Sequence, residues 1–337
     1  MLNRDGFGDD MGGVLSAIPM RIQIVTPGRR GTPTGNHITA LRWARLLRGL
    51  GHRVRVAQSY RGEPADALIA LHAYRSAEAV FRFRRQHPQK PIVLALTGTD
   101  VYGELAPSRA GHQAMELADR LIILQPLARK KIPPRWRSKA RVIFQSVEKG
   151  QRRAFRSPRS FDVAVVGHLR RVKDPFRAAL AARRLPADSR IRVLHAGGAL
   201  EPGMAARARA EMRRNRRYRW LGRVSPAAAR RLMARSRLLA LSSFLEGGAN
   251  VISEAVVEGV PVLASRIPGS VGLLGQGYPG YFPVGSTRAL ARLLRRAETD
   301  PRFCARLQRW CAKRARRFHP ARERAAWKKL LGEWRGN

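Results

Sequence analysis

Ser242-Ser243-Phe244-Leu245-Glu246-Gly247-Gly248-Ala249-Asn250-Val251-Ile252-Ser253-Glu254-Ala255 is the segment from which the architecture of this 337-residue chain can be inferred. The apolar run Leu238 to Leu241 precedes it and predicts a buried strand. A Gly-rich turn follows, and a helix is predicted to begin near Asn250 and to carry Glu254 in its first turns. Such a junction leaves backbone N–H groups pointing at one spot, with the positive end of the helix dipole behind them. The segment therefore indicates an anion pocket flanked by Glu246 and Glu254, which suits a diphosphate with sugar hydroxyls at both ends.

Short apolar segments alternate with amphipathic helical patterns along the rest of the chain. In the first half, strands are predicted at residues 22–25, 54–57, 67–71, 92–96, 121–124 and 142–144. In the second half, they are predicted at residues 162–166, 191–195, 238–241 and 260–264. Runs of this kind are typical of parallel sheets that are buried on both faces. The predicted fold class is α/β, in which ligands bind at the carboxyl ends of the strands.

Two loops at predicted strand ends carry basic residues. The loop after the first strand contains Arg29 and Arg30 and ends in Gly35-Asn36 at a helix mouth, so it is either an anion cradle or an ordinary surface loop. In the second half, residues 167–175 include Arg170 and Lys173, followed by Asp174-Pro175. Asp174 is predicted to cap a helix whose first residue is Pro175.

Similar local signals predict further helices, and one histidine lies at a predicted strand end. Ser225-Pro226 and Asp300-Pro301 each predict a capped helix, and a last helical pattern runs from Ala321 to Trp334. His72 ends the third predicted strand. The residues around it leave two roles open, because it either lines the cleft or caps a helix.

The charge of the chain is strongly positive, with a formal net charge of +43. Of the 66 basic residues, 57 are Arg, and they are scattered along almost every predicted helix. Scattered Arg with few aromatic partners is typical of a compositional bias, whereas nucleic-acid binding needs a clustered stripe. We therefore expect no specific nucleic-acid partner, although weak attraction to anionic surfaces and anionic substrates is expected from the charge.

The termini and the cysteines limit the class of protein further. Residues 1–19 lack a basic-then-apolar signal pattern and are expected to be a disordered leader or an upstream start, because Met20-Arg21-Ile22-Gln23-Ile24-Val25 resembles a beginning. No apolar run approaches the roughly 20 residues of a membrane span, which predicts a cytoplasmic protein. Cys304 and Cys311 share one face of a late helix and predict neither a disulfide nor a metal site.

Glu246, Glu254 and the following Glu258-Gly259-Val260-Pro261-Val262 resemble the paired-glutamate signature of the retaining-type GT-B glycosyltransferases of family 4. The resemblance covers nearly the whole chain from Met20. It implies two Rossmann-like domains whose parallel sheets face a deep interdomain cleft, with a C-terminal helix crossing back to the first domain. The implied limits are an acceptor domain at residues 20–149, a linker at 150–160, a donor domain at 161–318 and the crossover helix at 319–337.

The resemblance also implies roles for individual residues, without a metal or cofactor. Arg170 and Lys173 would neutralise the donor diphosphate, Glu246 would lie by the donor sugar, and Glu254 would bind the ribose diol. The remaining donor-binding residues would be His168, Arg223, Val224, Gly247, Gly248, Asn250 and Val251, with Arg223 and Val224 at the nucleobase.

The first half departs from the general family pattern in an informative way. Thr97 in Thr97-Gly98-Thr99-Asp100 stands where the family has a cleft histidine, and Phe144-Gln145-Ser146-Val147-Glu148 replaces Asn-Gly-Val-Asp. Together with Ile24-Val25-Thr26-Pro27, Thr34-Gly35-Asn36-His37 and Val166-Gly167-His168-Leu169-Arg170, these segments resemble the selenosugar synthases of selenoneine biosynthesis. The implied acceptor-binding residues are Arg29, Arg30, Thr34, Gly35, Asn36, Thr97, Gly98 and Asp100.

That closer resemblance implies transfer of N-acetylglucosamine or glucose from its UDP form to selenophosphate. Enzymes that supply selenophosphate and consume the selenosugar would be the pathway partners. Two alternatives remain open from the residues alone. One is an ordinary family 4 transferase that acts on a sugar or lipid-linked hydroxyl. The other is a non-catalytic anion or RNA binder on the same fold.

Overall fold

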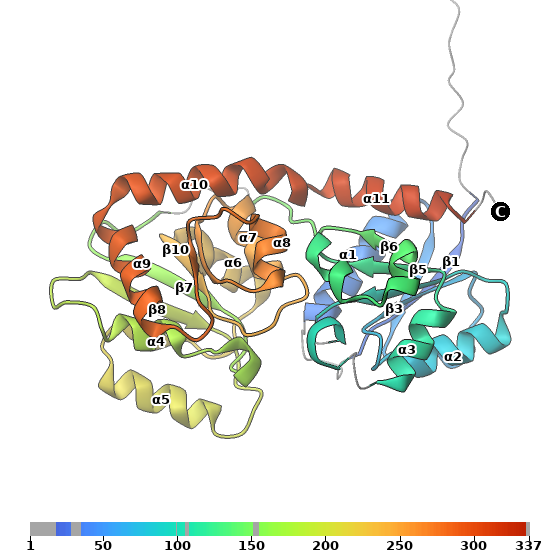
Figure 1. Cartoon of the computed structure of the whole chain (residues 1–337), viewed down its shortest axis with the longest axis horizontal. Coiled ribbons are helices and arrows are strands. Elements are labelled where there is room, and N and C mark those ends of the chain that lie inside the picture. Colours follow the sequence, from blue (N-terminus) through green and yellow to red (C-terminus); the bar gives the residue numbers. More distant parts are fainter. Residues whose placement is uncertain (1–17, 28–34, 99, 105–107, 151–154, 335–337) are drawn as a thin grey trace, which may run out of the picture.

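Two parallel six-stranded sheets, each flanked by helices, form two lobes of the molecule (Figure 1). The computed structural model describes residues 18–27, 35–98, 100–104, 108–150 and 155–334. Residues 1–17, which make up most of the leader predicted at residues 1–19, lie outside this part. The two sheets confirm the predicted α/β class, because every strand pairing is parallel.

The first sheet has the strand order β2-β1-β3-β4-β5-β6. Its strands are β1 (Arg21–Val25), β2 (Arg53–Ala57), β3 (Ala67–Leu71), β4 (Ile92–Leu96), β5 (Arg120–Ile123) and β6 (Ala140–Val142). Every residue of β3 and β4 is buried, which explains why these strands are continuous apolar runs. In the register of the sheet, Ile24 lies opposite Val56 and Ile69.

Among the residues described in this first domain, three α-helices and three short turns connect the strands. They are α1 (Gly35–Arg48), α2 (Ala77–Gln86), the π-helical turn η1 (Asp100–Glu104), α3 (Arg109–Leu117), and the 3-10 turns η2 (Pro126–Lys131) and η3 (Pro134–Lys139). The core divides into one cluster on each face of the sheet.

The second sheet has the order β12-β11-β10-β7-β8-β9. Its strands are β7 (Phe161–Val166), β8 (Ile191–Ala196), β9 (Tyr218–Trp220), β10 (Leu238–Leu241), β11 (Val262–Ser265) and β12 (Tyr281–Phe282). Ala164 lies opposite Leu239 on one side and Leu194 on the other. The connections are the turn η4 (Arg171–Lys173), α4 (Arg177–Ala182), α5 (Met204–Arg214), α6 (Pro226–Arg235), α7 (Asn250–Val257), α8 (Pro268–Leu274) and α9 (Thr287–Thr299).

The predicted helix starts are correct at two capped positions and wrong at a third. Ser225 and Asp300 accept hydrogen bonds from the N–H groups of Ala228 and Phe303, each at the third position of a helix that begins with proline. Asp174 does not cap a helix. It adopts φ 44°, in the left-handed region, and its carboxylate binds the Arg177 side chain at 2.7 Å. Helix α4 therefore begins two residues after Pro175, at Arg177.

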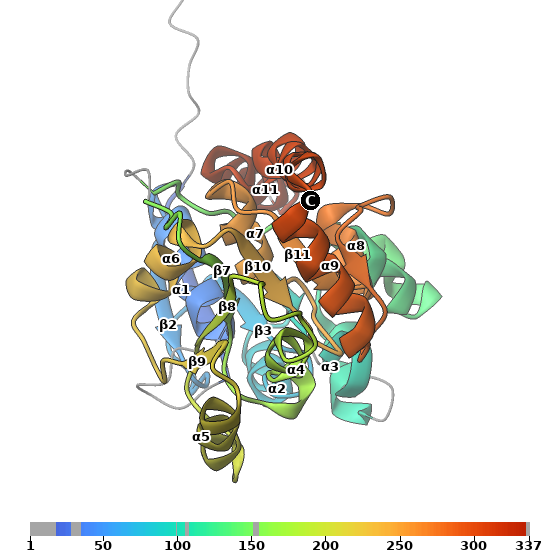
Figure 2. The same ribbon diagram turned by 90° about the vertical axis from the view of Figure 1, so that its left-hand side faces the viewer.

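The C-terminal segment spans both lobes, as the resemblance implied. Helix α10 (Pro301–Ala315) lies along the second domain, and after the turn η5 (Arg316–Phe318) helix α11 (Pro320–Gly332) continues along the first (Figure 1). The end-on view shows both helices on the same side of the molecule (Figure 2). Cys304 and Cys311 are both free and both on α10. In the described part of the chain, no helix has the length and apolar character needed to cross a membrane.

Candidate functional site

A cavity of about 360 Å³ lies between the two domains, at the carboxyl ends of their strands. Its second-domain wall comes from the loop after β7 and from the junction between β10 and α7. The four residues that the sequence assigned to diphosphate, sugar and ribose all line this one cavity: Arg170, Lys173, Glu246 and Glu254. His168, Gly247, Gly248, Asn250 and Val251 line it as well.

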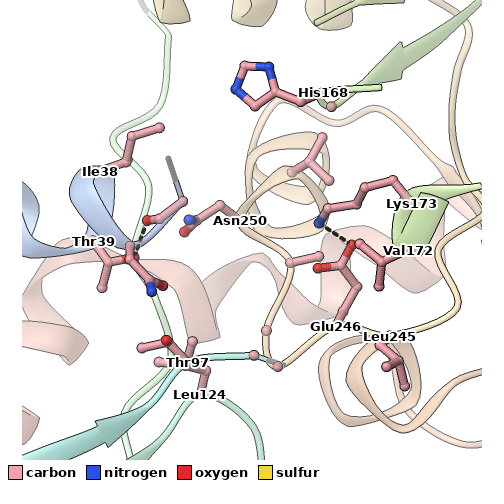
Figure 3. Close-up of a pocket in the computed structure, with 18 of the residues that line it drawn as sticks. Ile38, Thr39, Thr97, Leu124, His168, Val172, Lys173, Leu245, Glu246 and Asn250 are labelled. Atoms are coloured by element: carbon pink, nitrogen blue, oxygen red, sulfur yellow. Dashed lines mark hydrogen bonds and ion pairs between the residues drawn. The ribbon is translucent and has the colours of Figure 1, made fainter. Parts of the chain in front are cut away.

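An ion pair between Lys173 and Glu246 is the central polar contact of this wall. The Lys173 ammonium lies 2.6 Å from Glu246 Oε1, and the Ser243 hydroxyl donates to the same oxygen at 2.6 Å. Figure 3 shows Lys173 and Glu246 reaching toward each other on one side of the cavity, opposite Thr39 and Thr97. The pair thus brings a cation and a carboxylate to the same point of the cavity surface.

The two loops that carry this pair are braced against each other. The Phe244 N–H donates to the Val172 carbonyl at 2.9 Å, and the Ser242 hydroxyl donates to the Asp174 carbonyl at 2.8 Å. The Ser265 hydroxyl, at the end of β11, donates to the Ser243 carbonyl at 2.6 Å. Bracing of this kind holds charged groups in place before a ligand arrives, which is a requirement for electrostatic stabilisation of a transition state.

Glu254 lines the cavity from α7 and has a different environment. Burial raises the pKa of its carboxyl, while Arg230 and Arg42 act in the opposite direction. Within the described part of the chain, its carboxylate makes no hydrogen bond. A half-buried carboxylate in this state is suited to accept hydrogen bonds from a ligand diol.

The Gly-rich turn makes a close contact with the first domain. A side chain at Gly247 would meet the Thr97 carbonyl at 2.5 Å, and one at Gly248 would meet Leu124 Cβ at 2.5 Å. Within the described residues, the N–H groups of Gly247 and Gly248 make no backbone hydrogen bond. The turn therefore has two roles, because it joins the domains at close range and leaves N–H groups beside the cavity.

His168 is positioned by groups behind the cavity wall. Its Nδ1 accepts the Gly198 N–H at 3.1 Å. Behind it, the buried His195 donates from Nε2 to the Gly167 carbonyl at 3.0 Å, and its Nδ1 accepts the Tyr218 hydroxyl at 3.0 Å. Burial lowers the pKa of His195 to about 4, so the ring is neutral and suits both contacts. The sequence did not assign this positioning role to His195.

The first-domain wall contains Gly35, Asn36, Thr97 and Gly98, as predicted. Asp100 does not line the cavity, because it is fully buried beneath the wall. Its carboxylate accepts the N–H groups of Ala73, Thr97 and Gly98 at 3.1, 3.2 and 2.7 Å. It therefore fixes the two loops after β3 and β4, and Gly98 and Thr97 depend on it for their position.

Some of the predicted site residues are not among the described residues that line the cavity. Arg29, Arg30 and Thr34 fall outside the described residues. Arg223 and Val224 do not line the cavity, although the Arg223 side chain lies beside Gly198, which binds His168. His72, for which the sequence left open a place in the cleft or a helix cap, lines the cavity wall. Arg75, which the sequence did not single out, lines it as well.

Gln145 forms a polar junction between the domains that the sequence did not reveal. When its side-chain amide is oriented so that the nitrogen and the oxygen both have hydrogen-bond partners, the nitrogen donates to Asn250 Oδ1 at 2.8 Å and to the Gly248 carbonyl at 2.9 Å. Its oxygen then accepts from Arg42 Nη2 at 3.1 Å. Gln145 thereby connects α1 with the Gly-rich turn and with the first residue of α7. Only its place before the linker, in Phe144-Gln145-Ser146, could have drawn attention to it.

Comparison with known proteins assigns the chain to a family. The sequence model of the glycosyl transferases group 1 matches residues 148–318, which is about half of the chain. No curated protein matches the chain.

Solved structures show the same fold. HepE of Anabaena, crystallised with UDP and glucose, has a TM-score of 0.73 at 17% identity, with 93% of this chain and 100% of HepE covered. Sucrose-phosphate synthase of Thermosynechococcus elongatus has a TM-score of 0.74 at 14% identity, with coverages of 93% and 98%. A glycosyltransferase of Rickettsia africae has a TM-score of 0.68 at 12% identity, with coverages of 95% and 100%. The fold is GT-B, and the chain belongs to the glycosyl transferases group 1 family.

Proposed function

We propose that this glycosyltransferase moves N-acetylglucosamine, or glucose, from its UDP form to selenophosphate, without a metal. The product is a 1-selenosugar with a C–Se bond, for selenoneine biosynthesis. Membership of the family supports the transfer of a sugar. The similarity in fold to HepE, whose crystal structure contains UDP and glucose, supports a UDP-linked donor.

The donor half of the proposal is supported by the charges of the second-domain wall. Lys173, Arg170 and the N–H groups of the Gly-rich turn offer positive potential for the diphosphate. Glu246 and Glu254 offer acceptors for hydroxyl groups of the sugar and of the ribose. As UDP departs, negative charge develops on the diphosphate, and fixed cations lower the barrier to that step.

The acceptor half is supported by one observation above the others. The described residues of the first domain that line the cavity include Arg75 but no carboxylate. The carboxylates of the cavity, Glu246 and Glu254, both lie on the second-domain wall. A small anionic nucleophile is attracted by such a wall and needs no general base, and Thr97 offers no imidazole for that role.

The proposed chemistry is a direct displacement. A selenium electron pair of selenophosphate attacks the anomeric carbon, and the bond from that carbon to the UDP oxygen breaks, so that UDP leaves with the electron pair. The first product is a sugar joined through selenium to phosphate. Water then cleaves the Se–P bond and releases phosphate and the selenosugar. A single displacement inverts the anomeric centre, in contrast to the retention that the resemblance to family 4 implies. NMR should therefore find a β-linked product from an α-linked donor, and an α-linked product would contradict this step.

The test of the function is an assay with purified protein, UDP-N-acetylglucosamine or UDP-glucose, and selenophosphate generated in situ. Mass spectrometry should detect the selenosugar together with stoichiometric UDP. A protein in which Lys149, an exposed lysine away from the cavity, is changed to Met should turn over like the wild type. Turnover with sugar or lipid-linked hydroxyl acceptors, but none with selenophosphate, would overturn the proposed acceptor and leave an ordinary family transferase.

A further inference from the structure

Arginines gather at the edge of the second sheet that faces away from the interdomain cavity. Strands β7, β8 and β9 are neighbours in this sheet and run parallel (Figure 2). Their carboxyl ends lie on the side of the interdomain cavity, so the residues just before each strand meet at the opposite edge. Those residues include Arg159 before β7, Arg190 before β8, and Arg216 and Arg217 before β9. The topology therefore brings arginines from three separate segments to one place.

A second cavity, which we call the edge cavity, lies among these arginines and has a volume of about 500 Å³. Five arginines line it: Arg159, Arg190, Arg192, Arg216 and Arg217. The other described residues of its wall are three serines and one isoleucine, so within the described part of the chain no carboxylate lines it. Cavities of roughly 300–1,000 Å³ are typical of sites for small molecules. The size and the lining thus indicate a small, negatively charged ligand.

Two of the five arginines hold the wall together. Arg192 forms a paired contact with Asp162 of the neighbouring strand β7, at 2.8 and 3.0 Å. Arg217 Nη2 donates to three backbone carbonyls of the loop before β8, at 2.7, 3.2 and 3.1 Å. These contacts join the amino ends of the three strands, so the wall of the edge cavity is fixed before any ligand binds.

The other three arginines of the edge cavity are exposed: Arg159, Arg190 and Arg216. Within the described part of the chain, the side chains of Arg159 and Arg216 make no hydrogen bond and no ion pair. The Arg190 side chain makes a single contact, to the Pro158 carbonyl at 3.3 Å. The protein therefore leaves most of the donors of these three guanidinium groups to solvent or to a ligand.

The carboxylates beside this wall are paired with other residues. Asp162 is bound to Arg192, as described above. Glu298 accepts the Arg190 backbone N–H at 2.6 Å and pairs with Arg295 at 3.0 Å. Asp188 also pairs with Arg295, at 2.7 Å. The positive charge of the exposed arginines is therefore not neutralised by these three carboxylates.

We propose that Arg159, Arg190 and Arg216 form a binding site for an oligophosphate, which is a small anion with several linked phosphate groups. Guanidinium groups match pairs of phosphate oxygens in geometry, and three of them around one cavity suit several phosphates better than a single carboxylate. Among the described residues of the wall there is no aromatic side chain on which a nucleobase could stack, as binding of single-stranded nucleic acid generally requires. The site uses no residue of the interdomain cavity and is separate from the proposed function.

The test compares two double variants that remove the same charge from the chain. Arg159→Gln with Arg216→Gln removes two cations of the site. Arg309→Gln with Arg324→Gln is the control, because these arginines are exposed on α10 and α11 and do not line the edge cavity. Both double variants lower the net charge equally, so they weaken general attraction to anions equally.

Calorimetry measures the Kd for inorganic triphosphate in the presence of enough UDP to fill the interdomain cavity. The wild type should bind one triphosphate per chain under these conditions. The Kd should be at least about tenfold higher in Arg159→Gln with Arg216→Gln, because charge-assisted hydrogen bonds are lost, and should stay within about twofold in the control. The Kd for UDP should be unchanged in both variants. Arg190→Gln, a single change at the same wall, should weaken triphosphate binding in the same direction.

Three results would overturn the proposal. Failure of the wild type to bind triphosphate once UDP is present would mean that triphosphate binds only in the interdomain cavity. Equal losses in the two double variants would mean that the attraction comes from the net charge alone. Tighter binding of a single-stranded RNA oligonucleotide than of triphosphate, through the same arginines, would mean that the edge binds nucleic acid. Thermal unfolding checks that the variants are folded, and the melting temperatures should match because the replaced side chains of both double variants are exposed.

Discussion

Glu254 combines burial with a lack of partners, and its role follows from that combination. Burial raises the pKa of its carboxyl, whereas Arg230 and Arg42 favour the ionised form. Within the described residues it accepts no hydrogen bond, so its charge lowers stability until a ligand supplies donors. Under the proposed function, the ribose diol supplies these donors.

Changing Glu254 to Ala should raise the KM for the UDP-sugar by roughly 10- to 100-fold. The reason is the loss of charge-assisted hydrogen bonds, which contribute about 1.5–3 kcal/mol. Steady-state kinetics and calorimetry with UDP measure the effect. Glu254→Gln should melt at or above the wild-type temperature, because the buried charge is removed. An unchanged KM would mean that the ribose is bound by other groups.

Under the proposed function, Lys173 supplies positive charge where the leaving UDP develops negative charge. Lys173→Met keeps most of the side-chain volume and should lower kcat on the order of 10²- to 10³-fold at saturating donor, as the loss of a preorganised electrostatic group does in other enzymes. The double change of Lys173 and Arg170 should abolish turnover. Single-turnover kinetics measure the chemical step, with Lys149→Met as the control. Survival of turnover in the double variant would assign the diphosphate to different residues.

His195 makes the stability of the protein depend on pH. Burial lowers its pKa from 6.5 to about 4, so the unfolded chain binds a proton more readily than the folded one. The stability from the neutral ring is complete above pH 6.5 and is lost as the pH falls toward 4, by an amount on the order of 3 kcal/mol. Urea unfolding of wild type and His195→Gln at pH 7.5 and 4.5 should show the larger loss in the wild type. Equal losses of unfolding free energy in the two proteins would contradict a lowered pKa of His195 as the cause.

At the scale of elements, the Gly-rich turn before α7 meets the loop after β4 at very short range. A Cβ at Gly247 would lie 2.5 Å from the Thr97 carbonyl oxygen and 2.6 Å from Gly98 Cα. Both neighbours are backbone atoms, which cannot rotate away as a side chain can. The closeness of the two domains at the cavity therefore depends on the absence of a side chain at this position.

Gly247→Ala should force the two loops apart and misplace the first-domain wall relative to Glu246. A misplacement of about 1 Å can reduce a rate roughly 10²-fold, so kcat/KM should fall by that order. Small-angle scattering should detect a larger radius of gyration. Gly332→Ala is the control, because nothing lies within 4 Å of its added Cβ. A wild-type rate in Gly247→Ala would mean that the domains tolerate the separation.

The elements themselves follow largely from the sequence, whereas the contacts between them do not. Buried parallel strands are apolar throughout, and Ser225 and Asp300 cap helices by local chemistry, so pattern alone locates them. Asp174 was assigned wrongly because its left-handed conformation depends on the neighbouring loop, whose Ser242 binds the Asp174 carbonyl. The position of Asp100 beneath the wall depends on three N–H groups from two loops, which no local pattern reveals.

The residues of the cavity divide in the same way: some could be expected there from the sequence, and others are found only from contacts between the domains. Glu246, Glu254, Arg170 and Lys173 could be expected in one place because a family resemblance relates their positions, and all four line the cavity. Gln145 joins partners more than a hundred residues away on each side, Arg42 and Asn250. Long-range contacts of this kind arise only when the two domains meet, so they are found in the structure alone.

At the scale of the whole molecule, α11 fastens the end of the chain to the first domain. Trp327 packs edge-on against Trp43 with ring centroids 4.9 Å apart. The buried Glu323 accepts the Trp43 indole N–H at 2.7 Å and the Ser146 N–H at 2.8 Å, and pairs with Arg42 at 3.2 Å. Arg42 also contacts Asn250, at the start of α7, at 3.3 Å. One carboxylate therefore connects the C-terminal helix α11, the segment around Ser146 and, through Arg42, helix α7.

Glu323→Ala should lower the stability of the first domain by about 3–5 kcal/mol, the usual result of removing one partner of a buried pair. It should also raise the KM for the donor, because Arg42 loses the group that orients it toward Asn250. Thermal unfolding, donor kinetics and limited proteolysis of α11 measure the three effects. The control is Glu333→Ala at the end of α11, since Glu333 pairs with Arg120 and Arg141 in a more exposed setting, where ion pairs contribute about 0–1 kcal/mol. If both variants lose equal stability and bind the donor equally well, α11 only packs against the core of the first domain. If only Glu323→Ala weakens donor binding, α11 also connects the two domains.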